Sequence, residues 1–157
     1  MKMQAPSMSD KTSTLEFVWQ QHVGGNGATA RQYIDFVVDG QSLKVMLRSA
    51  QIGCLGWGAA ESQKESAAKL LLKSEPELPN GRHLLYVCPE CGDIGCGAIT
   101  VTIEKTAEHF GWKDFGYENN YDDGMPLLEN YRQIGPFFFD SNQYSQLLED
   151  YLKSLQS

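Results

Sequence analysis

The chain has 157 residues, and 41% of them are hydrophobic, which is sufficient for the core of one domain. It carries 20 Asp and Glu against 13 Lys and Arg, a formal net charge of −7. This charge argues against nonspecific binding to nucleic acid or to anionic membranes, because both require basic patches. A basic protein partner would suit it, although many cytoplasmic proteins are mildly acidic for solubility alone.

The chain contains no run of about 18 apolar residues, so the sequence predicts no membrane-spanning segment. Residues 1–13 carry polar side chains where a signal peptide needs an apolar core, and we expect a disordered lead there. Residues 14–157 then form a single domain, and the cytoplasm is the expected compartment. Cytoplasmic thiols stay reduced, so clustered cysteines indicate metal or redox chemistry more often than disulfides.

The N-terminal part predicts two strands and a short helix. Alternating apolar residues predict a strand over 14–20, and a second strand is expected over 31–38. The glycine-rich stretch between them lacks the Lys-Ser/Thr ending of a phosphate-binding loop, so we interpret it as a connection. Asp39-Gly40 is a turn signal, and Ser42 is a candidate N-cap for a short helix. The second strand of a hairpin is the alternative for this piece.

The middle of the chain predicts a helix followed by three strands. Residues 61–74 are rich in Ala, Leu, Lys and Glu, which favour helix. The side chains expected to face the core are Ala67, Ala68, Leu71 and Leu72. Strands are predicted over 82–88, 97–105 and 109–115, and together they indicate an antiparallel meander.

The C-terminal part predicts a loop, a strand and a helix. Residues 116–130 are rich in acidic side chains and predict an exposed loop, and GPFFFD predicts a short strand. Asp140 or Ser141 can then cap a last helix. The apolar face of that helix has steady three-and-four spacing and consists of Tyr144, Leu147, Leu148, Tyr151, Leu152 and Leu155. The expected fold is α+β: an antiparallel sheet packed against two or three helices, with a Cys-rich knuckle at a hairpin tip.

The stretch CPECGDIGCG, residues 88–97, holds three of the four cysteines. Cys88, Cys91 and Cys96 have the spacing C-x2-C-x4-C between two predicted strands. Thiolates bind Zn²⁺ tetrahedrally, and a structural site needs four ligands. Cys54, in a second glycine-rich loop, is the remaining cysteine. We therefore predict a structural zinc site formed by these four thiolates, which leaves no open position on the metal for catalysis.

Two alternatives to zinc stay open. A thiol-redox site would use Cys88 and Cys91, but the glycine-rich sequence after them does not readily begin the helix that lowers the pKa of such thiols. The cysteines could also be structural residues without a metal. Among possible fourth ligands, His22 and His109 are weaker candidates than Cys54, and His83 would point away from Cys88 in a regular strand.

The stretches CLGWG, LYVCPECGDIGCGAITV, W-x-DFGYENNY and GPFFFD together resemble a group of small, uncharacterised bacterial proteins that is frequent in actinobacteria. The likeness covers roughly residues 50–150. Some members are labelled oxidoreductases, which favours the redox alternative, but the sequence lacks the G-x-G-x-x-G nucleotide fingerprint between a strand and a helix. A more distant branch has one residue fewer between the first two cysteines. A structural knuckle should tolerate that change better than a redox pair.

The stretch DFGYENNYDDG combines acidic and aromatic side chains, which suits recognition of a basic protein, although a solvated acidic loop is the simpler alternative. The candidate partner-binding residues are Asp114, Tyr117, Glu118, Tyr121, Asp122 and Asp123. No catalytic set is apparent. We therefore expect a non-enzymatic protein-binding protein, such as an inhibitor or antitoxin-like immunity protein that neutralises a basic toxin or enzyme. The alternative is a thiol oxidoreductase that uses Cys88 and Cys91.

Overall fold

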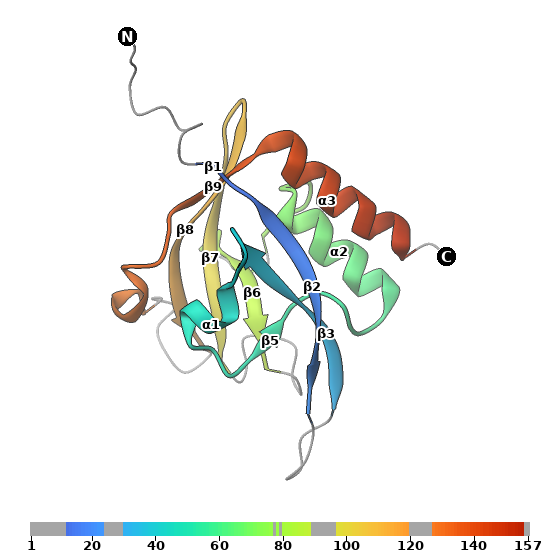
Figure 1. The fold of residues 1–157 in the computed structure, drawn as a ribbon, viewed down its shortest axis with the longest axis horizontal. Helices are drawn as coiled ribbons and strands as arrows, with labels where there is room; N and C mark the ends of the chain where they lie inside the picture. Colours follow the sequence, from blue (N-terminus) through green and yellow to red (C-terminus); the bar gives the residue numbers. More distant parts are fainter. Residues whose placement is uncertain are drawn as a thin grey trace.

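The computed structural model describes residues 12–23, 30–76, 78, 80–88, 97–119 and 127–155. They form an α+β fold with two sheets and three α-helices, which confirms the predicted class (Figure 1). The elements in chain order are β1 (Thr12–Ser13), β2 (Leu15–His22), β3 (Arg31–Val38), β4 (Gln41–Ser42), α1 (Leu43–Leu47), β5 (Ile52–Gly53), α2 (Ala60–Leu70), β6 (His83–Val87), β7 (Ala98–Lys105), β8 (His109–Glu118), the 3-10 helix η3 (Glu129–Tyr131), β9 (Phe137–Asp140) and α3 (Ser141–Ser154). In the described part of the chain, no helix combines the length and apolar character that crossing a bilayer requires.

The larger sheet has the strand order β1-β9-β8-β7-β6-β5. The strands from β5 to β9 are antiparallel to their neighbours, so the predicted meander is present as β6, β7 and β8. The short β1 pairs with β9 in parallel, which makes the sheet mixed rather than wholly antiparallel. β8 also continues to Glu118, beyond the predicted end, because Gly116 and Tyr117 pair with β7. The first part of the expected loop over 116–130 is therefore strand.

The smaller sheet has the order β2-β3-β4. β3 has the predicted limits, and Val38 pairs with Gln41 across a two-residue turn. Asp39 and Gly40 have φ angles of 52° and 83°, as the turn of a tight hairpin requires. The hairpin ends after two residues because the Ser42 hydroxyl accepts a hydrogen bond from the backbone N–H of Val45 and caps α1. Both interpretations of this piece are therefore correct in part.

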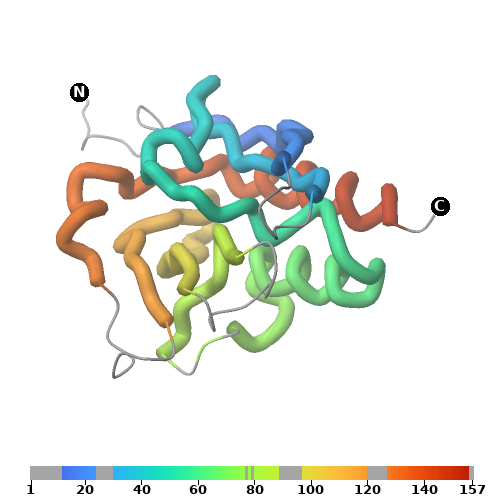
Figure 2. Tube along the Cα trace, turned by 90° about the horizontal axis from the view of Figure 1, so that it is seen from below, coloured from blue at the N-terminus to red at the C-terminus, as the bar shows by residue number. Residues whose placement is uncertain are grey.

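A core of aromatic residues lies between the two sheets and the helices. The ring of Phe36 on β3 meets the rings of Tyr86 and Trp112 edge-on, each at 5.6 Å between centroids. Tyr144 on α3 stacks on Phe110 with centroids 4.2 Å apart. α2 and α3 lie together on one side of the molecule, opposite the segment that precedes β9 (Figures 1 and 2). Asp140 caps α3 through the N–H of Gln143, as predicted.

Two sequence expectations about burial need correction. The alternating pattern places Trp19 on the buried face of its strand, but 52% of it is exposed, because β2 is the edge strand of the smaller sheet and the core covers its β3 partner Ile34 instead. The predicted helix over 61–74 ends at Leu70, and Leu72 has a positive φ of 61°, which no continuing helix contains. Of its predicted core face, Ala67 and Leu71 are buried, whereas Ala68 and Leu72 are half-buried.

Candidate functional site

The cysteine-rich and acidic segments start from the same end of the larger sheet. β6 ends at Val87, immediately before Cys88, and β7 begins at Ala98. Ala98 pairs with Glu118, the last residue of β8. Paired residues of neighbouring strands lie side by side, so Cys88, Gly97 and Asn119, the described residues next to these strand ends, lie at the same end of the sheet. Their proximity could not be read from the sequence, because the whole β7–β8 hairpin separates them along the chain.

Gly97, the last residue of the cysteine-rich segment, lies against Tyr117 of β8. Gly97 has a φ of +95°, and a Cβ at this position would overlap the hydroxyl of Tyr117. Glycine is therefore required here both by the backbone conformation and by the tyrosine above it. The side-chain amide of Gln51 also donates to the carbonyl oxygen of Gly97. Tyr117 is half-buried, so only part of its ring is accessible to a partner.

Glu118 lies inside the protein, which corrects its expected role as a partner contact. Only 3% of its surface is exposed, and its Oε2 accepts hydrogen bonds from Arg82 Nε at 3.0 Å and from Thr100 Oγ1 at 2.5 Å. Asn80 Nδ2 donates to the other carboxylate oxygen at 3.0 Å. A carboxylate with these partners is already neutralised and hydrogen-bonded. It therefore anchors the end of β8 and is not presented to solvent.

Asp114 is exposed at a bulge in β8. The pairing with β7 shifts between Thr100 and Thr102, where β8 contains one extra residue. Asp114 has a φ of 54°, and its backbone carbonyl accepts a hydrogen bond from Arg82 Nη2 at 2.5 Å. The left-handed conformation suits Asp better than most residues. The bulge directs the Asp114 carboxylate to the surface while the next residue, Phe115, is buried.

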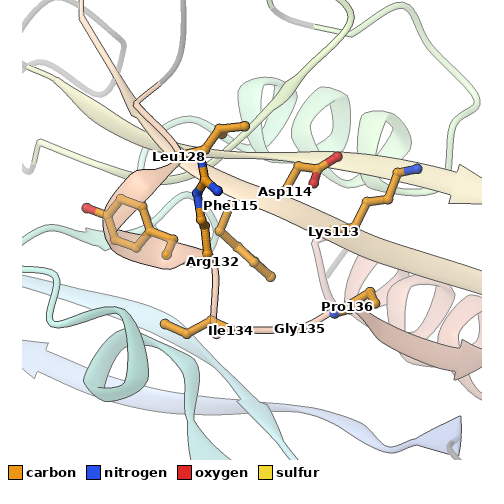
Figure 3. Close-up of a pocket in the computed structure, with 9 residues that line it drawn as sticks. Lys113, Asp114, Phe115, Leu128, Arg132, Ile134, Gly135 and Pro136 are labelled. Atoms are coloured by element: carbon orange, nitrogen blue, oxygen red, sulfur yellow. The ribbon is translucent and has the colours of Figure 1, made fainter.

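A pocket of about 340 Å³ opens beside Asp114 (Figure 3). β8 contributes one side of it, and the segment from η3 to β9 contributes the other. The lining residues are Lys113, Asp114, Phe115, Leu128, Tyr131, Arg132, Ile134, Gly135 and Pro136. Four of these side chains are apolar, and three are charged; the Arg132 side chain lies between Leu128 and Phe115 (Figure 3). This is the composition of a pocket that receives an anchoring side chain at a protein interface.

The charges at the rim of this pocket differ in how they are paired. Lys113 Nζ lies 2.8 Å from a carboxylate oxygen of Glu104, and Arg132 Nη2 lies 3.6 Å from one of Glu129. Among the described residues, the Asp114 carboxylate has no ion-pair partner. The Asp114 carboxylate is exposed at the rim, although its charge also raises the pKa of neighbouring Lys113, after the larger effect of Glu104, and of Arg82, against the larger effect of burial.

Two of the four predicted zinc ligands lie in the described residues, Cys54 and Cys88, and both are half-buried. They belong to neighbouring strands, since the backbone N–H of Cys54 donates to the carbonyl of Leu85 at 2.9 Å. Cys88 lies three residues beyond Leu85, about 10 Å along the strand. Cys54 also packs against the hydrophobic core. The assignment of Cys54 as fourth ligand stays a prediction.

The other predicted site residues lie outside the described residues: Cys91, Cys96, Tyr121, Asp122 and Asp123. Within the described part of the chain, no group of three or more His, Cys, Asp or Glu side chains is arranged to hold a metal ion. Because half of the predicted ligand set is not in that part, the zinc prediction is not tested by this result. The redox alternative for Cys88 and Cys91 is equally untested.

Asp35 is a buried acidic residue to which the sequence analysis assigned no role. It is 2% exposed and accepts hydrogen bonds from Ser42 Oγ at 2.5 Å and Tyr86 Oη at 2.7 Å. Burial lowers the pKa of nearby Lys44, and the Asp35 carboxylate offsets part of that shift. Asp35 thereby connects β3 to α1 and to β6. The sequence signal that could have identified it is an aspartate in the middle of the apolar strand YIDFVV.

Comparison of the sequence with protein-family models, with curated proteins and with solved structures gave no match. The family resemblance noted from the sequence motifs therefore stays a prediction. The function has to be inferred from the residues of the chain and their geometry.

Proposed function

We propose that the protein is a non-enzymatic binding protein of the inhibitor or immunity type that acts on a basic protein partner. The proposed binding surface consists of Asp114, Tyr117 and the adjoining pocket, together with Tyr121, Asp122 and Asp123. The partner would be a toxin or enzyme whose contact surface is rich in Lys and Arg. Glu118 takes no direct part, because its carboxylate is buried.

The observation that carries this proposal is the exposed Asp114 carboxylate, which forms no ion pair with another described residue, beside a pocket lined in part by apolar side chains. A Lys or Arg side chain has an apolar stem and a charged head, so it can fill such a pocket while its head reaches Asp114. The net charge of −7 would steer a basic partner toward the protein.

We also propose that Cys88, Cys91, Cys96 and Cys54 hold a structural zinc ion. The zinc would fix the β6–β7 connection, which starts from the same end of the sheet as the acidic segment. Thiolate ligands require a reducing compartment, which agrees with the expected cytoplasmic location. In this proposal the metal supports the binding surface and takes no part in catalysis.

Partner capture by charge variants tests the proposed function. We would immobilise the full chain, capture proteins from cells of its own source at modest salt, and identify them by mass spectrometry. The triple variant Asp114→Asn, Asp122→Asn and Asp123→Asn should lose most of the captured basic partner. A loss of about 1 kcal/mol per charge would weaken binding by about two orders of magnitude in total. Asn is chosen because it tolerates the positive φ of Asp114.

The matched control removes three negative charges elsewhere: Glu65→Gln, Glu108→Gln and Asp150→Asn, all at exposed positions. The control should keep the partner, because its net charge equals that of the test variant while the proposed surface is intact. Equal loss in both variants would show that only bulk charge matters. Capture of no basic partner by the wild-type chain would also contradict the proposal.

A further inference from the structure

The outer edge of β2 is open over part of its length. Among the described strands, β2 pairs only with β3, and four consecutive residues from Val18 to Gln21 are exposed. Val18 and Trp19 are 38% and 52% exposed. Figure 1 shows β2 and β3 as a two-stranded ribbon, one end of which extends from the body of the molecule. An exposed edge of this kind can pair with another strand.

The direction of the backbone groups follows from two hydrogen bonds of β3 and its turn. The N–H of Asp39 donates to Thr14 on the β2 side, whereas the N–H of Ile34 donates to Leu55 on the opposite side, both at 2.9 Å. Backbone groups alternate along a strand, so the odd-numbered residues of β3 face β2. Their partners on β2 are the even-numbered residues. The odd-numbered residues of β2 therefore direct their N–H and C=O groups to the open edge.

The edge positions of β2 are Leu15, Phe17, Trp19 and Gln21. The side chain of Gln143 on α3 occupies the first of them: its Nε2 donates to the Leu15 carbonyl at 2.8 Å, and its Oε1 accepts from the Leu15 N–H at 3.4 Å. Within the described residues, no hydrogen bond reaches the outward backbone groups of the other three. The segment FVWQQ contains neither Lys nor Pro, the residues that commonly protect an open edge.

We propose that this edge pairs with the same edge of a second copy of the chain, in an antiparallel arrangement centred on Trp19. Phe17 of one copy then lies opposite Gln21 of the other, and Trp19 lies opposite Trp19. All three open positions are paired, while Gln143 marks the end of the pairing. Registers centred one residue earlier or later use only two of the three positions.

The self-complementary register favours a second copy as the occupant. In the register centred on Trp19, the Glu16 carboxylate of each copy lies opposite the His22 imidazole of the other. These two residues share one face of β2, because both positions are even. The symmetry therefore produces two acid–imidazole pairs, one on each side of the Trp19 pair. The two smaller sheets would join into one continuous sheet of six strands across the dimer axis.

Molar mass against concentration tests the proposal. Sedimentation equilibrium of the full chain should show a concentration-dependent rise toward twice the monomer mass of 17.5 kDa. A chain that stays monomeric up to about 1 mM would overturn the proposal. In that case, another protein's strand would be the remaining candidate for the edge.

A substitution at the edge tests the backbone pairing itself. Gln21→Pro removes an outward N–H that β2–β3 pairing does not use, and Gln21→Ala keeps it. Proline is tolerated on an edge strand of this kind. The proline variant should be monomeric and keep the wild-type circular dichroism spectrum, while the alanine variant dimerises. Equal dimerisation of the two variants would contradict pairing through this edge.

Charge exchange tests the register. His22→Glu places like charges opposite each other twice per dimer and should weaken dimerisation by about tenfold. The double variant Glu16→Lys, His22→Glu restores opposite charges and should recover the dimer. Gln133→Glu, which adds the same charge at an exposed position away from β2, is the control and should leave dimerisation unchanged. Failure of the double variant to recover the dimer would exclude this register.

Discussion

Arg82 and Glu118 form an ion pair that is almost completely removed from solvent, with side-chain exposures of 8% and 4%. Arg82 also donates to the backbone carbonyls of Thr100 and Asp114 at 3.0 and 2.5 Å. One guanidinium thus holds the β8 bulge and the end of the same strand. Leaving either charge without its partner in such a position costs about 3–5 kcal/mol. This single pair therefore positions both the exposed Asp114 and the contact of Tyr117 with Gly97.

His83, next to Arg82, gives a prediction at the same scale. It is 2% exposed, and burial, together with the charge of Lys69, lowers its pKa from 6.5 to about 4. Above pH 6.5 the imidazole is neutral in both states and adds no pH dependence. As the pH falls from 6.5 to 4, the unfolded chain binds the proton and the folded chain does not. Stability should therefore fall, by up to about 3 kcal/mol from this residue.

The measurement is urea unfolding of the wild-type chain and of His83→Leu between pH 7.5 and 4. Acidic residues contribute to both profiles, so the difference between the two profiles isolates His83. Below pH 6.5, the free energy of unfolding should fall less in His83→Leu than in the wild-type chain. Parallel profiles would show that His83 titrates normally in the folded protein.

At the scale of elements, the segment from β5 to α2 packs so closely against β3 that their backbone atoms are in direct contact. The N–H of Ile34 donates to the Leu55 carbonyl at 2.9 Å. A Cβ at Gly53 would overlap the carbonyl oxygen of Ile34, and one at Gly56 would lie 2.7 Å from the Ile34 nitrogen. The glycines of this loop thus let two sheets approach where side chains would hold them apart. Cys54 lies between these two positions, so its place in the fold depends on them.

Gly53→Ala should destabilise the protein by about 3 kcal/mol or more, because the added methyl group meets backbone atoms that cannot move aside. Gly81→Ala is the matched control. Gly81 has a φ of +85° and open space around its Cβ position, so its substitution costs only backbone strain of about 1 kcal/mol. Chemical denaturation of the two variants compares these costs. A Gly53 variant no less stable than the Gly81 variant would show that the close approach is not required.

At the scale of the whole molecule, the strand order of the larger sheet brings a cysteine-rich and an acidic part of the chain to the same end of that sheet. The cysteine-rich connection joins β7 at Ala98, and Ala98 pairs with Glu118, a residue of the acidic stretch. If the predicted zinc site forms there, the metal stabilises the end of the sheet that carries the proposed binding surface. Loss of metal should then weaken both stability and partner binding.

Elemental analysis of untagged protein should find one zinc ion per chain, and Cys88→Ser should lose it. Removal of a structural zinc that contributes about 3 kcal/mol would lower Tm by roughly 10 °C. Cys54→Ser tests the fourth ligand, since loss of zinc in that variant confirms it and full retention excludes it. A wild-type chain without metal and with two readily oxidised thiols would contradict the zinc site and favour the oxidoreductase alternative.

Local interactions within a few residues determined what the sequence could predict. Asp39-Gly40 specifies a tight turn, Ser42 and Asp140 cap the helices that follow them, and the spacing in 144–155 specifies the buried face of α3. For the candidate site, the sequence indicated Asp114 as one of six candidate partner contacts, and Asp114 is exposed. Each of these features depends on neighbours along the chain.

Only the tertiary structure decided the features that depend on distant partners. Glu118 is buried because Arg82, 36 residues away, neutralises it there. Trp19 is exposed because β2 is the edge strand of its sheet and the core covers Ile34 on β3 instead, although the alternating pattern of β2 continues without a break. The pocket beside Asp114 and the open edge of β2 likewise arise where separate segments meet or fail to meet. Burial, pairing and free surface are set by contacts between segments, and periodicity within one segment does not encode them.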